Sequence, residues 1–214
     1  SDETDKQLYR FTDHGKREVG MRFDLTVPFA RFAAQHISTL GTPFKRYHMG
    51  TVWRGENTQR GRYREFMQCD FDTIGTTSAI SDLETVLVVH DLLAAIGIDK
   101  FTIRINDRRI LSGILEVLGL TSKTTHVLRC LDKTGKIPRD TLAKELQEQG
   151  VSVPSIDRLL GLGELAGSAT DVLNELQDLV GESVIGTRGV GAVRALLSGL
   201  SEVGVGDDRI TLDP

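Results

Sequence analysis

Four arginines gather around a polar segment that runs from Gly55 to Glu65, with Arg54 immediately before it. A guanidinium group binds phosphate through two parallel hydrogen bonds, and a rigidly held cation stabilises charge that develops on a phosphoryl group. Arg54 ends a strand-like run, so we expect it to be held more rigidly than the arginines of the loop. The loop arginines are better placed to move onto a triphosphate or an RNA end.

The two strand-like runs that flank this loop predict an antiparallel hairpin over 44–74. Because side chains alternate across a strand, the hairpin has one apolar and one polar face. We expect the apolar face to be packed, with Cys69 on it as a buried, inert thiol. The polar face suits a small polar ligand, although a solvated face with surface salt bridges is the commoner arrangement for an arbitrary hairpin. The predicted polar face consists of Arg46, His48, Val52, Arg54, Phe66, Gln68, Asp70 and Asp72, and the apolar face of Tyr47, Met49, Thr51, Trp53, Met67, Cys69 and Phe71.

Composition and charge exclude several classes of protein. The chain has 214 residues, with 26 Lys and Arg against 30 Asp and Glu, so a globally basic nucleic-acid binder is excluded but a local basic patch is not. No apolar run approaches the ~20 residues of a membrane-spanning helix, so no membrane association is expected. Cys69 and Cys130 lie far apart, which disfavours a disulfide framework or a cysteine zinc site and favours a reducing, cytoplasmic setting. No histidine has the spacing of a zinc ligand, and no metal site is expected.

Hydrophobic periodicity and cap signals predict helices over most of the remaining chain. Ser81 and Glu84 have the spacing of a capping box, and Asp107 precedes an apolar helical stripe. From about Thr121 the chain becomes rich in Leu, Gly and Glu and nearly free of aromatic residues, which is the best candidate for a domain boundary. We expect helices over 28–41, 81–97, 107–119, 140–149, 169–180 and 188–200, and strands over 101–105 and at 210–214.

The hairpin pattern resembles motif 2 of the class II aminoacyl-tRNA synthetases, in the version of the histidyl-tRNA synthetase family. The residues that carry the resemblance are Trp53–Glu56 and, after the loop, Arg62–Asp72. Upstream, Tyr9–Asp13 and Met21–Arg31 are similar to the amino-acid-binding segment of the same family. The similarity covers about residues 9–120, including a stretch at 106–111, and is weak beyond that.

For ATP, the resemblance implies four binding residues. Arg54 would grip the α-phosphate and stabilise the transition state as the histidine carboxylate attacks it, which makes it the one catalytic residue. Glu56 would contact the adenine amino group, Phe66 would stack on the adenine ring, and Arg62 would reach the phosphates. Mg²⁺ would be bound through the phosphates of ATP, with no metal ligands from the protein.

For histidine, the resemblance implies a pocket with two sides. Asp24 and Thr26 would hold the α-amino group, while Gln68 and Asp72 would line the pocket, with Asp72 able to pair with an imidazole N–H. Asp24 could equally cap the helix that begins near Pro28, and the two roles are compatible. Phe66, Gln68 and Asp72 have the same parity along their strand, so one face of the sheet can hold both substrates.

The resemblance also implies a fold and a domain order. The fold would be α/β (α+β), with a mostly antiparallel class II synthetase-type sheet flanked by helices and a small helical insertion domain. Residues 1–120 would form part of the catalytic core, residues 121–182 the insertion, and residues 183–214 the return to the core. The family's motif 1, motif 3 and anticodon-binding domain would lie outside these residues, so the chain alone is not expected to complete aminoacylation.

Three functions are compatible with such a pattern. The first is a histidine–tRNA ligase, a cytoplasmic homodimer that acts on histidine, ATP and tRNA. The second is a non-catalytic, synthetase-like regulatory subunit of ATP phosphoribosyltransferase in histidine biosynthesis. The third is a synthetase-like RNA-binding module of a sensor protein. Degenerate relatives need not keep the ATP contacts, whereas this chain retains both the ATP and the histidine residues, which favours the ligase.

Overall fold

The structure is a computed structural model that describes residues 2–206 and 208–213, with no side chains described for residues 2–4. The outermost positions of the predicted domains, Ser1 and Pro214, lie outside the described residues. Contacts between residues divide the chain into two compact units, 1–77 and 78–214. The predicted mixture of helices with mainly antiparallel strands is confirmed, because two of the three two-stranded sheets in the described part of the chain are antiparallel.

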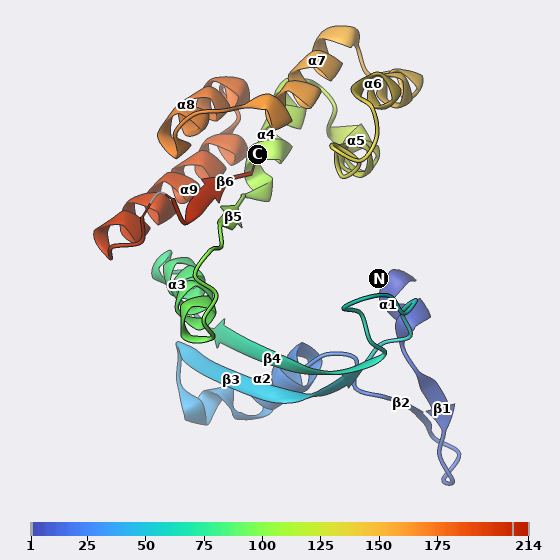
Figure 1. Cartoon of the computed structure of the whole chain (residues 1–214). Helices are drawn as coiled ribbons and strands as arrows, with labels where there is room; N and C mark the ends of the chain where they lie inside the picture. The colour runs from blue at the N-terminus through green and yellow to red at the C-terminus, as the bar shows by residue number, and fades with distance from the viewer. Residues whose placement is uncertain (1, 207, 214) are drawn as a thin grey trace. The chain divides into compact units, whose positions relative to one another are not determined.

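The first unit is built around one long hairpin, β3–β4, with helix α2 lying along it (Figure 1). Gly41, at a φ of 78°, ends α2, as the sequence predicts. A second, short hairpin, β1–β2, is not predicted by the sequence, because its strands have only three residues each and show little alternation. The elements of this unit are α1 (Asp2–Gln7), β1 (Arg10–Thr12), β2 (Glu18–Gly20), α2 (Thr26–Leu40), β3 (Phe44–Trp53) and β4 (Glu65–Ile74).

The register of β3 and β4 places the polar residues opposite one another, as the alternation predicts. Arg46 pairs with Asp72, and His48 pairs with Asp70. Closer to the loop, Gly50 lies opposite Gln68. Since paired residues point to the same side of a sheet, arginine, carboxylate and amide groups share one face of the hairpin.

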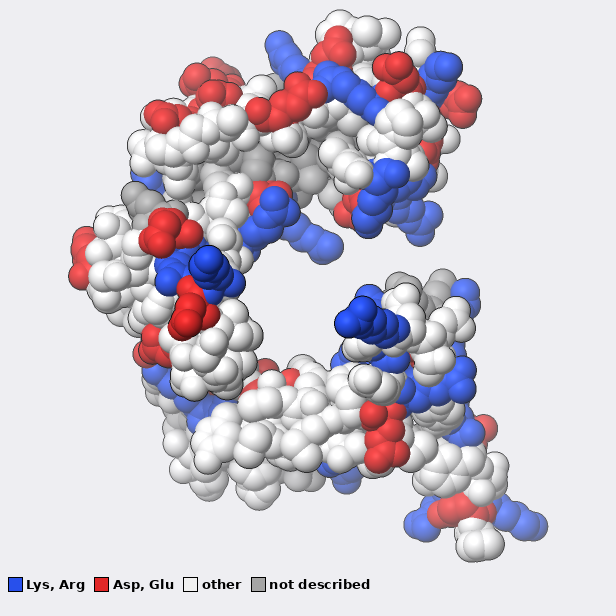
Figure 2. Space-filling model, in the orientation of Figure 1, with Lys and Arg blue, Asp and Glu red and all other residues white. Residues whose placement is uncertain are grey.

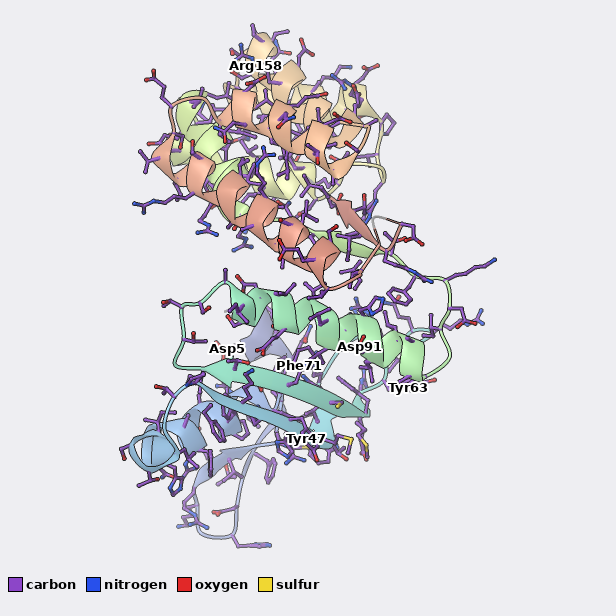
Figure 3. All side chains as sticks on the ribbon, turned by 90° about the vertical axis from the view of Figure 1, so that its left-hand side faces the viewer. Asp5, Tyr47, Tyr63, Phe71, Asp91 and Arg158 are labelled. Carbon is purple, nitrogen blue, oxygen red and sulfur yellow. The ribbon has the colours of Figure 1, made fainter. Side chains whose placement is uncertain are left out.

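The burial of the two faces is the reverse of the prediction. On the apolar face, Tyr47 is 78%, Met49 60% and Met67 72% exposed, and Cys69 is exposed as well, so its prediction as a buried thiol is wrong. Tyr47 and Phe71 pair with each other in the register and so both belong to this apolar face; both are labelled in Figure 3. The polar face is the more buried one.

The polar face is covered by the segment that leads into α2. Leu25 is fully buried, as is Val52 near the loop end of the polar face, and Phe29 of α2 is buried as well. The main chain of this segment binds the strand edge, because Trp53 donates its backbone N–H to the carbonyl oxygen of Arg22 at 2.8 Å. The alternation shows which side chains share a face, but this cover decides which face is inside.

The second unit is mainly helical, with one parallel pair of strands, β5 and β6. Basic and acidic side chains are interspersed over its helices in the view of Figure 2. No helix among the described residues is both long and apolar enough to cross a membrane. The elements of this unit are α3 (Ile80–Ala95), β5 (Ile103–Ile105), α4 (Arg108–Val117), α5 (Thr124–Leu131), α6 (Arg139–Glu148), α7 (Val153–Gly161), α8 (Ala169–Val180), α9 (Val184–Glu202) and β6 (Ile210–Leu212), with short 3₁₀ turns at Thr121–Lys123 and Leu162–Glu164.

The main core of the second unit is formed by aliphatic side chains from α4 to α9. Helices α5 to α8, which fall in the predicted insertion over 121–182, share this core with α4 and α9. The sequence does not predict α5 and α7, because each has fewer than ten residues. The limits of the insertion stay a prediction.

Helices α4 and α9 cross at glycine residues. A Cβ atom at Gly113 of α4 would lie 2.4 Å from the Cα atom of Gly186 in α9, and one at Gly186 would lie 3.1 Å from the Cα atom of Gly113. Glycine therefore lets the two backbones approach more closely than any other residue allows.

Helix α4 has a strong N-terminal cap, as its position after Asp107 predicts. Asp107 accepts a hydrogen bond from the backbone N–H of Arg109 at 2.8 Å, and the Arg109 guanidinium donates to the same carboxylate at 2.5 Å. The side-chain hydrogen bond from Arg109 is the largest cause that lowers the pKa of Asp107 below its usual range. The predicted capping box of Ser81 is wrong, since Ser78 instead accepts from the N–H of Ile80.

Replacing Asp107 by alanine should lower the free energy of unfolding of the second unit by about 1 kcal/mol at neutral pH, because the cap is lost. Since the folded pKa of Asp107 lies below the unfolded one, the stabilisation by its charge is present above about pH 4 and is lost as the pH falls through the folded pKa. Urea unfolding followed by helical circular dichroism at pH 7 and pH 3 measures this. Asp107→Asn is the control, because it keeps a capping oxygen but not the charge. A penalty for Asp107→Ala that does not shrink in acid contradicts this prediction.

Candidate active site

Arg54 is held at the end of β3 by neutral oxygen acceptors. Its Nε donates to the carbonyl oxygen of Phe23 at 3.2 Å, and its Nη2 donates to Oε1 of Gln68 at 3.2 Å. Among the described residues no carboxylate forms an ion pair with this guanidinium. Arg54 is therefore fixed in place while its charge is left without a counter-ion from the described part of the protein.

Two aromatic rings flank the same guanidinium. Its carbon atom lies 4.7 Å from the centre of the Phe23 ring and 5.2 Å from the centre of the Phe66 ring. Both distances are within the range of cation–π contacts. The proposed phosphate-binding cation and the proposed adenine-stacking ring are thus neighbours.

Gln68 links Arg54 to a carboxylate further along β4. While its Oε1 accepts from Arg54, its Nε2 donates to Oδ1 of Asp70 at 2.6 Å. This fixes the orientation of the Gln68 amide, because the amide has a distinct donor and acceptor end. The sequence assigns no role to Asp70; the structure places it as the group that orients Gln68.

Glu56 and Arg62 bind each other across the loop that follows Arg54. Arg62 Nη1 lies 3.2 Å from Glu56 Oε2, and Arg62 is largely exposed whereas Glu56 is not. The loop is closed by the backbone N–H of Arg54, which donates to the carbonyl oxygen of Arg64 at 2.9 Å. An ion pair whose cation is largely exposed is screened by water, so Arg62 can leave Glu56 for a phosphate at little cost.

Asp24 caps α2, one of the two roles that the sequence leaves open for it. Its Oδ1 accepts from the backbone N–H of Val27 at 2.9 Å, and Thr26 is exposed at the first position of the helix. A carboxylate bound through one oxygen retains acceptor capacity, so the cap does not exclude a substrate contact. The contacts of Asp24 and Thr26 do not include Arg54 or Gln68.

Arg46 connects Asp72 to the segment of Asp24 and Thr26. The sequence predicts that Arg46 lies on the polar face but gives it no function. Arg46 Nη2 lies 2.7 Å from Oδ2 of Asp72 and donates to the carbonyl oxygen of Leu25 at 2.9 Å. The pairing of an arginine with a carboxylate at this register follows from the alternation. The contact with Leu25 does not, because nothing in the sequence relates residue 25 to β3.

The eight predicted site residues all lie in the first unit and fall into three groups. Arg54 contacts both Phe66 and Gln68. Glu56 and Arg62 pair in the loop, and Asp72 is connected to the segment of Asp24 and Thr26 through Arg46. The described residues hold no group of three or more His, Cys, Asp or Glu side chains arranged for a metal ion.

Comparison with known proteins gives matches along the whole chain. A family model described as histidyl-tRNA synthetase matches residues 1–214. The histidine–tRNA ligase of Rhodopirellula baltica is 57% identical over 214 residues, which are 100% of this chain and 48% of that protein. That of Wolinella succinogenes is 48% identical over 199 residues, 92% of this chain and 45% of that protein. The chain therefore spans about half the length of the curated relatives that it matches.

Solved structures give the same relationship. The crystal structure of histidyl-tRNA synthetase from Nostoc sp. PCC 7120 matches with a TM-score of 0.85 at 28% identity, over 96% of this chain and 48% of that one. A protein from Bacillus halodurans, described as an ATP phosphoribosyltransferase regulatory subunit/histidyl-tRNA synthetase, shares the fold, with a TM-score of 0.82 at 20% identity over 98% of this chain and 53% of that one. With a family model that covers every residue and relatives this similar, the chain belongs to the histidyl-tRNA synthetase family.

Proposed function

We propose that the protein to which this chain belongs is a histidine–tRNA ligase, which activates histidine with ATP and transfers it to tRNA. The observation that carries the proposal is the environment of Arg54. This guanidinium is fixed by two neutral acceptors, lies against the ring of Phe66 and has no carboxylate partner among the described residues. A preorganised cation of this kind stabilises an anionic transition state without having to rearrange.

In the first step, an oxygen atom of the histidine carboxylate forms a bond to the α-phosphorus of ATP. The bond between this phosphorus and the departing pyrophosphate breaks, which leaves histidyl-adenylate. Arg54 would bind the α-phosphoryl oxygens, where negative charge is concentrated in the transition state. In the second step, a ribose hydroxyl at the 3′ end of tRNA attacks the carbonyl carbon of histidine, and AMP leaves.

The three other predicted ATP-binding residues, Glu56, Arg62 and Phe66, would position ATP. Phe66 would stack on adenine, Glu56 would accept from the adenine amino group, and Arg62 would exchange its ion pair with Glu56 for the phosphates. ATP would arrive with Mg²⁺ already on its phosphates. Mg²⁺ commonly binds through substrate phosphates with few protein ligands.

Histidine would lie between Asp72 and the start of α2. Asp72 would accept from an imidazole N–H, Gln68 would line the pocket, and Asp24 and Thr26 would hold the α-amino group. A pocket that forms hydrogen bonds with the imidazole group discriminates strongly against amino acids without an imidazole, because its polar groups would then be left unpaired. We also propose a homodimer and a cytoplasmic location, the latter supported by two cysteines that are both free.

Histidine-dependent exchange of pyrophosphate into ATP tests the function directly. The full-length protein should catalyse exchange with histidine, and omission of histidine or its replacement by glutamine should reduce exchange to background. Charging of tRNA with labelled histidine should accompany it.

The regulatory alternative predicts a different result. A protein that is inert in exchange but activates an ATP phosphoribosyltransferase would contradict the ligase proposal and support the second function. The likeness to the Bacillus halodurans protein is one of fold alone, so it does not favour that alternative.

A further inference from the structure

Arg46 contacts three separate parts of the first unit. Besides Asp72 Oδ2 and the Leu25 carbonyl oxygen, which both lie within 2.9 Å of the same nitrogen atom, its guanidinium carbon lies 4.3 Å from the centre of the Phe29 ring. The side chain is only 11% exposed. Burial together with three different partners leaves the guanidinium one position to occupy.

The contact with Leu25 matters because of the neighbours of this residue. Leu25 is fully buried between Asp24 and Thr26, so a bond to its carbonyl oxygen fixes the main chain that carries both side chains. Asp72 lies on β4 and Arg46 on β3. One guanidinium thus connects the two sides of the proposed histidine pocket.

The ion pair leaves hydrogen-bonding capacity on Asp72. Although Arg46 Nη2 and Asp72 Oδ2 are 2.7 Å apart, Oδ2 is buried and has no hydrogen bond of good geometry within the described residues, and the same is true of Arg46 Nε. The Asp72 side chain as a whole is 25% exposed. Since Oδ2 is buried beside Arg46, the oxygen that can accept an N–H from a ligand is Oδ1, while the charge of Arg46 holds the carboxylate in place.

We propose that Arg46 is a positioning residue for recognition of the amino acid, which sets the Asp72 carboxylate and the segment of Asp24 and Thr26 at a fixed spacing. The inference rests on the proposed function, because the ligand of this pocket is histidine. Arg46 itself would not touch the substrate. Its effect would be on histidine and not on ATP, since the ATP residues are attached to Arg54 and the loop.

The test is steady-state exchange by the full-length protein with Arg46→Met, which removes the charge and keeps much of the length. The KM for histidine should rise about 10- to 100-fold, as expected for a lost hydrogen bond to a charged group, while the KM for ATP changes little. Arg46→Lys should recover part of the loss, because lysine keeps the charge but lacks the planar fork. Calorimetric titration with histidine alone should show the same order of affinities.

Two further variants separate positioning from packing. Phe44→Leu is the matched control: Phe44 stacks on Phe29 with ring centres 6.2 Å apart, so the variant loosens the same contact of α2 with β3 but keeps the guanidinium. It should lower the melting temperature and leave the KM for histidine nearly unchanged. If Arg46 acts through Asp72, Arg46→Met should add little to the defect of Asp72→Asn.

The outcomes are distinguishable. An unchanged KM for histidine in Arg46→Met overturns the inference while the function stands. Equal increases of KM for histidine and ATP, or an equal effect of Phe44→Leu, also overturn it, because they indicate a purely structural role. If the unmodified protein neither exchanges nor binds histidine, the proposed function fails first and this inference fails with it.

Discussion

Replacing Arg54 by alanine should slow formation of histidyl-adenylate by the full-length protein about 100- to 1,000-fold. This corresponds to about 2.7–4 kcal/mol in the activation free energy, the range found when one preorganised donor to a developing negative charge is removed. The loss is expected to be large because Arg54 is already fixed by Phe23 and Gln68 before the substrate binds. Rapid-quench measurement of a single turnover gives the rate of the chemical step.

Two variants control for other effects of losing an arginine. Arg54→Lys retains a cation but not the bidentate geometry, so it should be slower than the wild type and faster than Arg54→Ala. Arg17→Ala removes an arginine of the same unit that pairs with Asp13 in the β1–β2 hairpin, and it should leave the rate unchanged. A near-wild-type rate in Arg54→Ala would remove Arg54 from its catalytic role.

Replacing Gly113 by alanine should destabilise the second unit by about 1–3 kcal/mol, the usual cost of overpacking a core. In an exposed helix the same change stabilises, because alanine has the higher helix propensity. Here the added methyl group would meet backbone atoms of Gly186 at 2.4 and 2.8 Å, and backbone cannot rotate away as a side chain can. Helices α4 and α9 would have to separate.

Gly191, in the same helix α9, offers a matched control. A Cβ atom there would meet nothing within 4 Å, and the residue is exposed. Gly191→Ala should therefore stabilise the unit by about 0.5–1 kcal/mol. Urea unfolding followed by circular dichroism measures both variants. If Gly113→Ala stabilises as Gly191→Ala does, the close crossing of α4 and α9 is not a property of the protein.

The polar face of the hairpin shows how far the sequence leads. Alternation along two runs is enough to place Arg46 opposite Asp72 and to put Phe66 and Gln68 on one side. It does not show which side is covered, because the cover comes from residues 22–29, a separate segment with no local signal that joins it to β3. The prediction that the apolar face is packed, with Cys69 buried, fails for this reason.

The helices show a similar limit. Long amphipathic segments such as α4, α8 and α9 are predicted within a few residues, because their apolar periodicity extends over several turns. Short elements such as α5 and the β1–β2 hairpin are missed, since they have too few residues for a period to emerge. The start of α3 is misplaced because two serines, Ser78 and Ser81, lie close to it, and the sequence does not show that the N–H of Ile80 is bound by Ser78.

Arg46 of β3 and Arg54, which directly follows β3, bind the segment before α2 through its main chain: the acceptors are the carbonyl oxygens of residues 25 and 23. A carbonyl oxygen is the same whichever amino acid provides it. Substitutions at these two positions can therefore accumulate among relatives without breaking either bond, provided that the chain follows the same path. A ranking of positions by side-chain invariance would register only the ring of Phe23 and the buried side chain of Leu25, and would miss these two main-chain acceptors, which depend on the path of the chain.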